Sequence, residues 1–164
     1  MTTLVLGLGN ALMGDDGLGA AVISALTVGY RFPTNVRLVD GGTLGLDLLP
    51  RIEEAQRLLV IDALVMDKAP GTLVRLEGEE VPRAFASKLS LHQAGLQALL
   101  AVAELQGHLP AQLVVHGAQG ETLFPGIGLS SALKKALPQL LRNVLAELAF
   151  WGIEIESVEA EGAA

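Results

Sequence analysis

The chain has 164 residues, 51% of them hydrophobic, and carries a net charge of −7 with no cysteine. This length and apolar content fit one folded domain and exclude a disordered chain, and no apolar run approaches the roughly 20 residues of a membrane span. The missing cysteines exclude disulfides, thiolate metal sites and a cysteine nucleophile, and the negative charge argues against nucleic acid as a partner.

The N-terminal segment predicts a buried strand over residues 3–9, because the apolar run TLVLGLG ends in glycines. Residues 10–14 form the expected turn, and an amphipathic helix with an acidic N-terminus follows over about 16–27. The segment lacks the basic region and cleavage site of a secretory signal. We therefore expect a soluble protein in the cytoplasm, with no membrane partner.

The next segments alternate between strand and helix. Strands are expected over 36–40 and 57–62, with a short helical stretch at 45–54 between them. Residues 72–76 follow the turn Ala69-Pro70-Gly71 too closely for a crossover helix. They therefore predict an antiparallel edge strand.

The C-terminal half continues this alternation. Ser90 and Gln93 have the S-x-x-Q spacing of a capping box, which predicts a helix up to Gly107 with His92 in its first turn. Residues 112–119 then read as the last core strand.

The last helix is expected over 129–150, where Pro138 should kink or restart it. The acidic stretch 154–164 is expected to fray as a flexible tail, so residues 1–153 form one domain. The elements predict an α/β fold: a single three-layer α/β/α domain whose five-stranded twisted sheet is mostly parallel, with helices on both faces and one antiparallel edge strand.

Acidic residues and one histidine are placed where strands end. Asp40 and Asp62 close two strands, Asp15 and Asp16 follow the first strand by a short turn, and His92 begins a helix near the same edge. Ligands of such sheets bind at the carboxyl ends of the strands. Two carboxylates and an imidazole suit a divalent metal such as nickel or zinc, with positions left for water or substrate.

Structural roles compete with this metal site. Asp15 or Asp16 can be a helix N-cap, and Asp62 can cap the turn after its strand. The other histidines are rivals of His92: His108 lies in a loop, whereas His116 falls in a core strand and is expected to be a hydrogen-bonded structural residue.

The glycine cluster GLGNALMGDDGLG does not fit the dinucleotide pattern G-x-G-x-x-G, because Leu12 and Met13 intervene. Gly7 and Gly9 instead predict a tight turn from strand to loop beside the site. The serines lack a G-x-S-x-G nucleophile elbow, which leaves a hydrolase triad unsupported.

Five separated segments carry a family resemblance. They are LVLGLGNALMGDDGLG near the N-terminus, DGGTLGLDLL at 40–49, VIDALVMDKAPGT at 60–72, SLHQAGL at 90–96 and HGAQGETLFPGIGLSSALKKALP at 116–138. In this order they resemble the endopeptidases that trim the C-terminus of the nickel-iron hydrogenase large subunit. Carried over by position, the family's metal-binding residues fall on Asp16, Asp62 and His92, with Asp15 as a competitor of Asp16. The surrounding loops carry Gly7, Gly9, Asn10, Asp15, Asp40, Gly41 and Gly42.

The resemblance implies that the protein removes a C-terminal extension from the large-subunit precursor after nickel insertion. Nickel is then presented by the substrate. Whether the free enzyme binds another divalent metal stays open. Either a metal-dependent or an aspartic-type mechanism, in which Asp16 and Asp62 activate water, fits these residues.

Two other functions remain open at this point. Peptidyl-tRNA hydrolases also begin with a GxGN strand-loop on an α/β/α sheet, although the charge of −7 argues against tRNA binding. The third interpretation is a non-catalytic module that binds nickel or a nucleotide.

Overall fold

The computed structural model describes residues 1–42, 45–81, 91–121 and 127–158, with backbone alone for 45–46 and 91–95. Its main sheet has five strands in the order β3-β1-β4-β6-β5. Their bounds are Val36–Gly42 for β3, Thr3–Leu8 for β1, Arg57–Leu64 for β4, Gln112–Gln119 for β6 and Leu73–Glu77 for β5.

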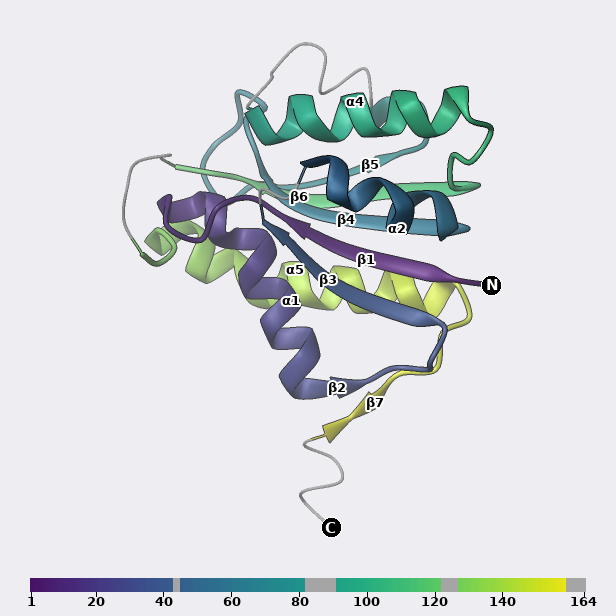
Figure 1. Ribbon diagram of the computed structural model, residues 1–164. Coiled ribbons are helices and arrows are strands. Elements are labelled where there is room, and N and C mark those ends of the chain that lie inside the picture. Colours follow the sequence, from purple (N-terminus) through teal and green to yellow (C-terminus); the bar gives the residue numbers. More distant parts are fainter. Residues whose placement is uncertain (43–44, 82–90, 122–126, 159–164) are drawn as a thin grey trace.

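Four strands run parallel, and the edge strand β5 runs antiparallel to β6. The parallel strands β1, β3, β4 and β6 therefore end together, on the left in Figure 1, at what we call the carboxyl edge. The predicted mixed five-stranded sheet with one antiparallel edge strand is confirmed.

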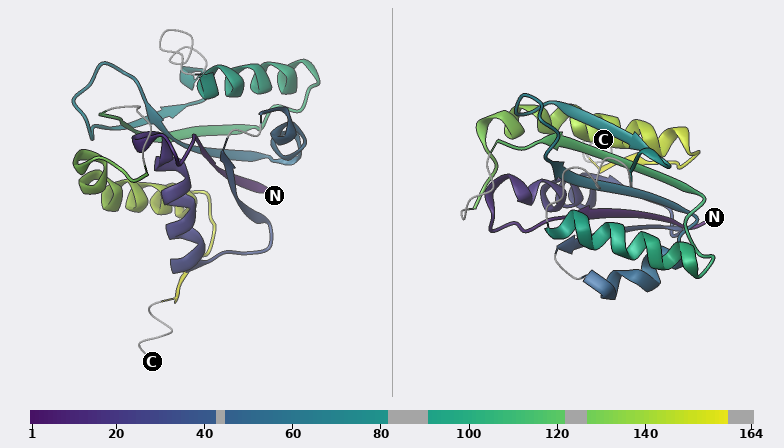
Figure 2. Two further views of the ribbon diagram at one scale, coloured as in Figure 1. Left: turned by 60° about the vertical axis from the view of Figure 1, so that its left-hand side comes forward. Right: turned by 90° about the horizontal axis from the view of Figure 1, so that it is seen from above.

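Helices cover both faces of the sheet (Figures 1 and 2). One face carries α1 (Leu18–Gly29) and α5 (Ser131–Phe150), and the other carries α2 (Leu49–Glu54) and α4 (Leu91–Leu105). Short 3-10 turns precede two of them: η1 (Gly14–Gly17) leads into α1 and η2 (Gly45–Leu48) leads into α2. The three-layer α/β/α prediction is thereby confirmed.

Alternating side chains of the strands fill two cores. In β4, Leu58 and Val60 belong to the core beneath α2 and α4, whereas Leu59 and Ile61 belong to the core beneath α1 and α5. Both faces of a central parallel strand are covered, which explains its nearly unbroken apolar sequence.

The C-terminal region differs from the expectation. The described part of the expected tail does not fray, because β7 (Glu156–Ser157) pairs antiparallel with β2 (Tyr30–Arg31) after α1. Of the kink or restart expected at Pro138, the restart is wrong, since α5 continues through that residue, and the kink stays a prediction. Pro138 lies on the exposed side of the helix, where water can bond to the carbonyl that loses its partner.

Within the described residues, no helix combines the length and apolar character required to cross a bilayer.

Candidate functional site

Asp16 lies in η1, between the end of β1 and the start of α1. Its side chain is buried, and its Oδ2 accepts a hydrogen bond from the backbone N–H of Asn10 at 2.8 Å. Asn10 in turn accepts from the N–H of Leu12 through its own Oδ1, at 2.9 Å. The turn after β1 thus folds back on Asp16 and holds it at the carboxyl edge.

Two glycines make this arrangement possible. A Cβ on Gly9, whose φ is +105°, would lie 2.1 Å from the carbonyl oxygen of Asp16. A Cβ on Gly7 would lie 2.5 Å from the carbonyl oxygen of Gly19, where α1 crosses β1. The tight packing expected of Gly7 and Gly9 is observed, because side chains there would displace η1 or α1, and their role beside a functional site stays a prediction.

Asp15 points toward a different part of the chain. Its Oδ1 accepts from the backbone N–H of Ser130 at 2.6 Å, and its Oδ2 accepts from the Ser130 hydroxyl and from the N–H of Glu121, both at 2.8 Å. Glu121 and Ser130 are near the two ends of the connection between β6 and α5. The neighbouring aspartates therefore bond to different loops, Asp15 to this connection and Asp16 to the turn after β1.

Asp62 lies inside β4, which continues to Leu64, two residues beyond the expected end. Its side chain is 0% exposed. By alternation with Val60 and Leu64 it faces α2 and α4. The start of α1 approaches the same part of β4, since a Cβ on Gly19 would lie 2.8 Å from the carbonyl oxygen of Ile61. Since η1 also packs against β4, the backbone of β4 around Asp62 and the turn η1 lie at the same end of the sheet.

His92 lies in the first turn of α4, as expected from its sequence. Figure 1 shows that α4 begins at the carboxyl edge and runs toward the opposite edge. The backbone position thus places His92 at the same edge as Asp16 and on the same sheet face as Asp62. Its side chain lies outside the described set, as does Ser90 of the expected capping box.

The rival histidines are bound elsewhere. His108 follows the far end of α4, and its Nδ1 lies 2.9 Å from Oε2 of Glu53. His116 is buried in β6 among residues that alternate toward α1 and α5, and its Nε2 lies 2.9 Å from Oε1 of Glu147. His116 thus has the hydrogen-bonded structural role expected of it, on the opposite sheet face from Asp62.

Sequence reasoning missed the ion network around His116. Glu147 of α5 also accepts hydrogen bonds from Arg75 of β5, at 2.6 and 3.3 Å. Burial lowers the pKa of His116 despite its bond to Glu147. Burial alone would raise the pKa of Glu147, but the hydrogen bonds from Arg75 and His116 outweigh it and hold that pKa below its usual value. The network joins α5 to the sheet.

Asp40 is exposed near the end of β3, and its Oδ1 accepts from the backbone N–H of Gly42 at 3.1 Å. Gly41 is buried against Leu6, and the carbonyl of Gly42 accepts from the N–H of Gly9 at 3.3 Å. These residues thus shape the loop beside the turn after β1, and the supporting role expected of them at the site stays a prediction.

The donor set fits a divalent metal in its chemistry: two carboxylates on neighbouring elements and an imidazole position at one edge. Among the residues whose side chains are described, no three His, Cys, Asp or Glu form a group that could bind a metal. The side chain of His92 is outside that set, so the predicted trio stays a prediction.

Comparisons with known proteins agree on one family. The family model described as "Hydrogenase maturation protease" matches residues 20–147. The Hydrogenase 2 maturation protease of Escherichia coli is 39% identical over 161 residues, which cover 98% of this chain and 98% of that protein. The hydrogenase expression/formation protein HupD of Rhodobacter capsulatus is 41% identical over 93% of this chain and 73% of its own length.

Solved structures lead to the same group. The hydrogenase maturating endopeptidase HybD from E. coli superposes with a TM-score of 0.94 at 37% identity, over 98% of this chain and 99% of that one. The [NiFe] hydrogenase maturation protease HybD from Thermococcus kodakarensis has a TM-score of 0.71 at 26% identity, over 91% of this chain and 99% of that one.

Proposed function

The chain belongs to the hydrogenase maturation protease family, and we propose that Asp16, Asp62 and His92 form the site with which this endopeptidase recognises nickel and cuts its precursor. The proposed substrate is a nickel-loaded hydrogenase large-subunit precursor, from which the C-terminal extension is removed. The observation that carries the proposal is the placement of all three residues, from η1, β4 and α4, at the carboxyl edge. We place this reaction in the cytoplasm.

Asp16 is the preferred ligand over Asp15 for a geometric reason. Three hydrogen bonds direct the carboxylate of Asp15 to Glu121 and Ser130. Asp16 instead lies in η1 and accepts a hydrogen bond from the turn after β1. Strand β1 pairs with β4, the strand that carries Asp62. Bound nickel would supply a Lewis acid that polarises the groups taking part in hydrolysis.

The protein's own residues would hold the metal and move protons. The carboxylate of Asp16 or Asp62 takes a proton from the attacking water while the oxygen of that water bonds to the peptide carbonyl carbon. The C–N bond then breaks, and the leaving nitrogen takes up the proton. Asp62 is buried beside the apolar core, where charges are poorly screened and interact strongly with a cation. His92 would bind the metal through its neutral imidazole ring.

Two histidine variants test the site. His92→Ala should abolish cleavage of a nickel-loaded precursor, followed by the mass of its C-terminus, while circular dichroism shows an unchanged fold. His108→Ala is the matched control, because His108 lies beyond the far end of α4 and pairs with Glu53. Equal cleavage by both variants would remove His92 from the proposed site.

The other two functions considered from the sequence have lost their support. The matching family model, the Hydrogenase 2 maturation protease of E. coli and the HybD structure are all hydrogenase maturation proteases, and a protease hydrolyses peptide bonds.

A further inference from the structure

Three large apolar side chains are exposed in the loops at the carboxyl edge. Leu12 is 62% exposed in the turn after β1, Val65 is 39% exposed directly after β4, and Ile127 is 88% exposed in the connection before α5. We call these three residues the apolar rim. Each belongs to a loop that follows a parallel strand of the sheet, so the rim lies on the loops beside Asp16 and Asp62.

Hydrogen bonds join the loops that carry the rim. Asp15, three residues after Leu12, bonds to Ser130, three residues after Ile127. The same carboxylate bonds to the N–H of Glu121, and the adjacent N–H of Gly120 donates to the carbonyl of Leu64 at 3.2 Å. Val65 follows directly. The carboxylate of Asp15 and the backbone of Gly120 therefore join the three loops that carry the rim residues.

The loop after β4 has a further anchor. The side chain of Gln119, buried at the end of β6, accepts from the N–H of Met66 at 2.6 Å and donates to the carbonyl of Gly120 at 3.0 Å. Exposed apolar side chains on loops that hydrogen bonds already hold in place are typical of a contact surface, because less ordering is then required when the partner binds.

The position of the rim identifies its partner. A peptide bond cut at Asp16 and Asp62 has to reach the carboxyl edge, so the chain on either side of that bond crosses the loops of the rim. We propose that Leu12, Val65 and Ile127 bind an apolar part of the precursor next to the bond that is cut. This inference rests on the proposed function and adds the surface by which the enzyme holds its protein substrate.

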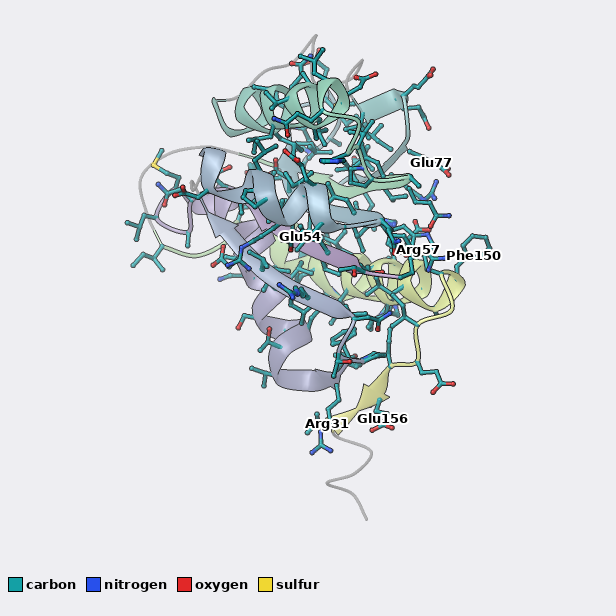
Figure 3. The ribbon with its side chains drawn as sticks, turned by 45° about the vertical axis from the view of Figure 1, so that its right-hand side comes forward. Arg31, Glu54, Arg57, Glu77, Phe150 and Glu156 are labelled. Carbon is teal, nitrogen blue, oxygen red and sulfur yellow. The ribbon has the colours of Figure 1, made fainter. Side chains whose placement is uncertain are left out.

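The test compares exposed apolar residues at the two edges. Leu12→Ser and Ile127→Ser remove rim side chains that contribute little to the core. The matched controls are Leu105→Ser, at the far end of α4, and Val28→Ser, at the far end of α1; these residues are 88% and 75% exposed. Figure 3 shows the opposite edge, where Arg57 begins β4 and Phe150 ends α5.

Each rim variant should raise KM for the nickel-loaded precursor by about 5- to 10-fold and change kcat by less than about twofold. The two controls should leave both constants within about twofold of the wild-type values. In an Asp62→Asn background, which keeps the precursor uncut, each rim variant should weaken precursor binding in calorimetry by the same factor relative to Asp62→Asn alone.

Two results would overturn the inference. Unchanged KM and unchanged binding in both rim variants would show that the rim does not contact the precursor. A shift in oligomeric state with unchanged KM would assign the rim to contacts between copies of this chain. Failure of the wild-type enzyme to cut the precursor would instead contradict the proposed function, so the two failures are distinguishable.

Discussion

The carboxylate of Asp15 accepts hydrogen bonds from both the backbone N–H and the hydroxyl of Ser130, at 2.6 and 2.8 Å. Ser130 is the N-cap of α5, where its Oγ also accepts from the N–H of Leu133 at 3.3 Å. A negative charge at a helix N-terminus is favourable. One buried carboxylate therefore joins η1, which carries Asp16, to the start of the last helix.

Asp15→Asn should lower the free energy of unfolding by about 2 to 3 kcal/mol, because a buried carboxylate that accepts several hydrogen bonds loses its charge. Urea denaturation measures this change. Asp47→Asn removes the same charge from an exposed residue of η2 and should change stability by less than about 0.5 kcal/mol. Equal effects of the two substitutions would contradict a structural role for Asp15.

Gly9→Ala should reduce both stability and cleavage. The added methyl group would lie 2.1 Å from the carbonyl oxygen of Asp16, and the backbone has a φ of +105°. Gly152→Ala is the matched control, with a φ of +83° and open space around the added atom. Gly152→Ala should lower the free energy of unfolding by about 1 kcal/mol through backbone strain alone and leave kcat unchanged. If Gly9→Ala behaves like this control, the turn does not hold Asp16 as described.

Acid should destabilise the protein through His116. Burial lowers the pKa of this histidine from 6.5, so the folded protein binds the proton less readily than the unfolded chain does. The contribution of the neutral His116 to the free energy of unfolding is therefore fully present above about pH 6.5 and is lost as the pH falls below that value. Glu147, whose pKa is lowered from 4.5, adds a second loss in a more acidic range, as its carboxylate becomes protonated.

Urea denaturation between pH 7 and pH 5 separates the histidine contribution. His116→Gln keeps a hydrogen-bonding group toward Glu147 and removes the titrating ring, so its stability should vary less over this range than that of the wild type. His108→Gln removes an exposed histidine and should keep the wild-type dependence. An unchanged pH dependence in His116→Gln would exclude this residue as the cause.

The strands and most helices could be predicted because their signals are local. The run at 112–119 gives β6 with the same bounds, and Pro70-Gly71 places the antiparallel strand β5 after a turn. The ends of strands are harder to predict than their centres. Strand β4 continues past its expected end at Asp62, because Ala63 and Leu64 are apolar and pair with β6. The region of the proposed site follows from the rule that ligands bind at the carboxyl ends of parallel strands.

The contacts that organise the site could not be predicted from local patterns. Asp15 and Ser130 are 115 residues apart, and His116 and Glu147 are 31 apart. Nothing in the sequence distinguishes Asp15 from Asp16 as a ligand, whereas the structure directs their carboxylates to different loops. The pairing of β7 with β2 is equally non-local, which explains why an acidic tail was expected there instead of a strand.

In the proposed function, the enzyme recognises nickel in its substrate. The most direct test incubates the purified protein with nickel-loaded and with metal-free large-subunit precursor and follows the C-terminal mass of each over time. We predict that the nickel-loaded precursor is trimmed and that the metal-free precursor stays intact, because the proposed ligands Asp16, Asp62 and His92 require the metal to hold the precursor in place. Equal trimming of the two precursors would contradict this account.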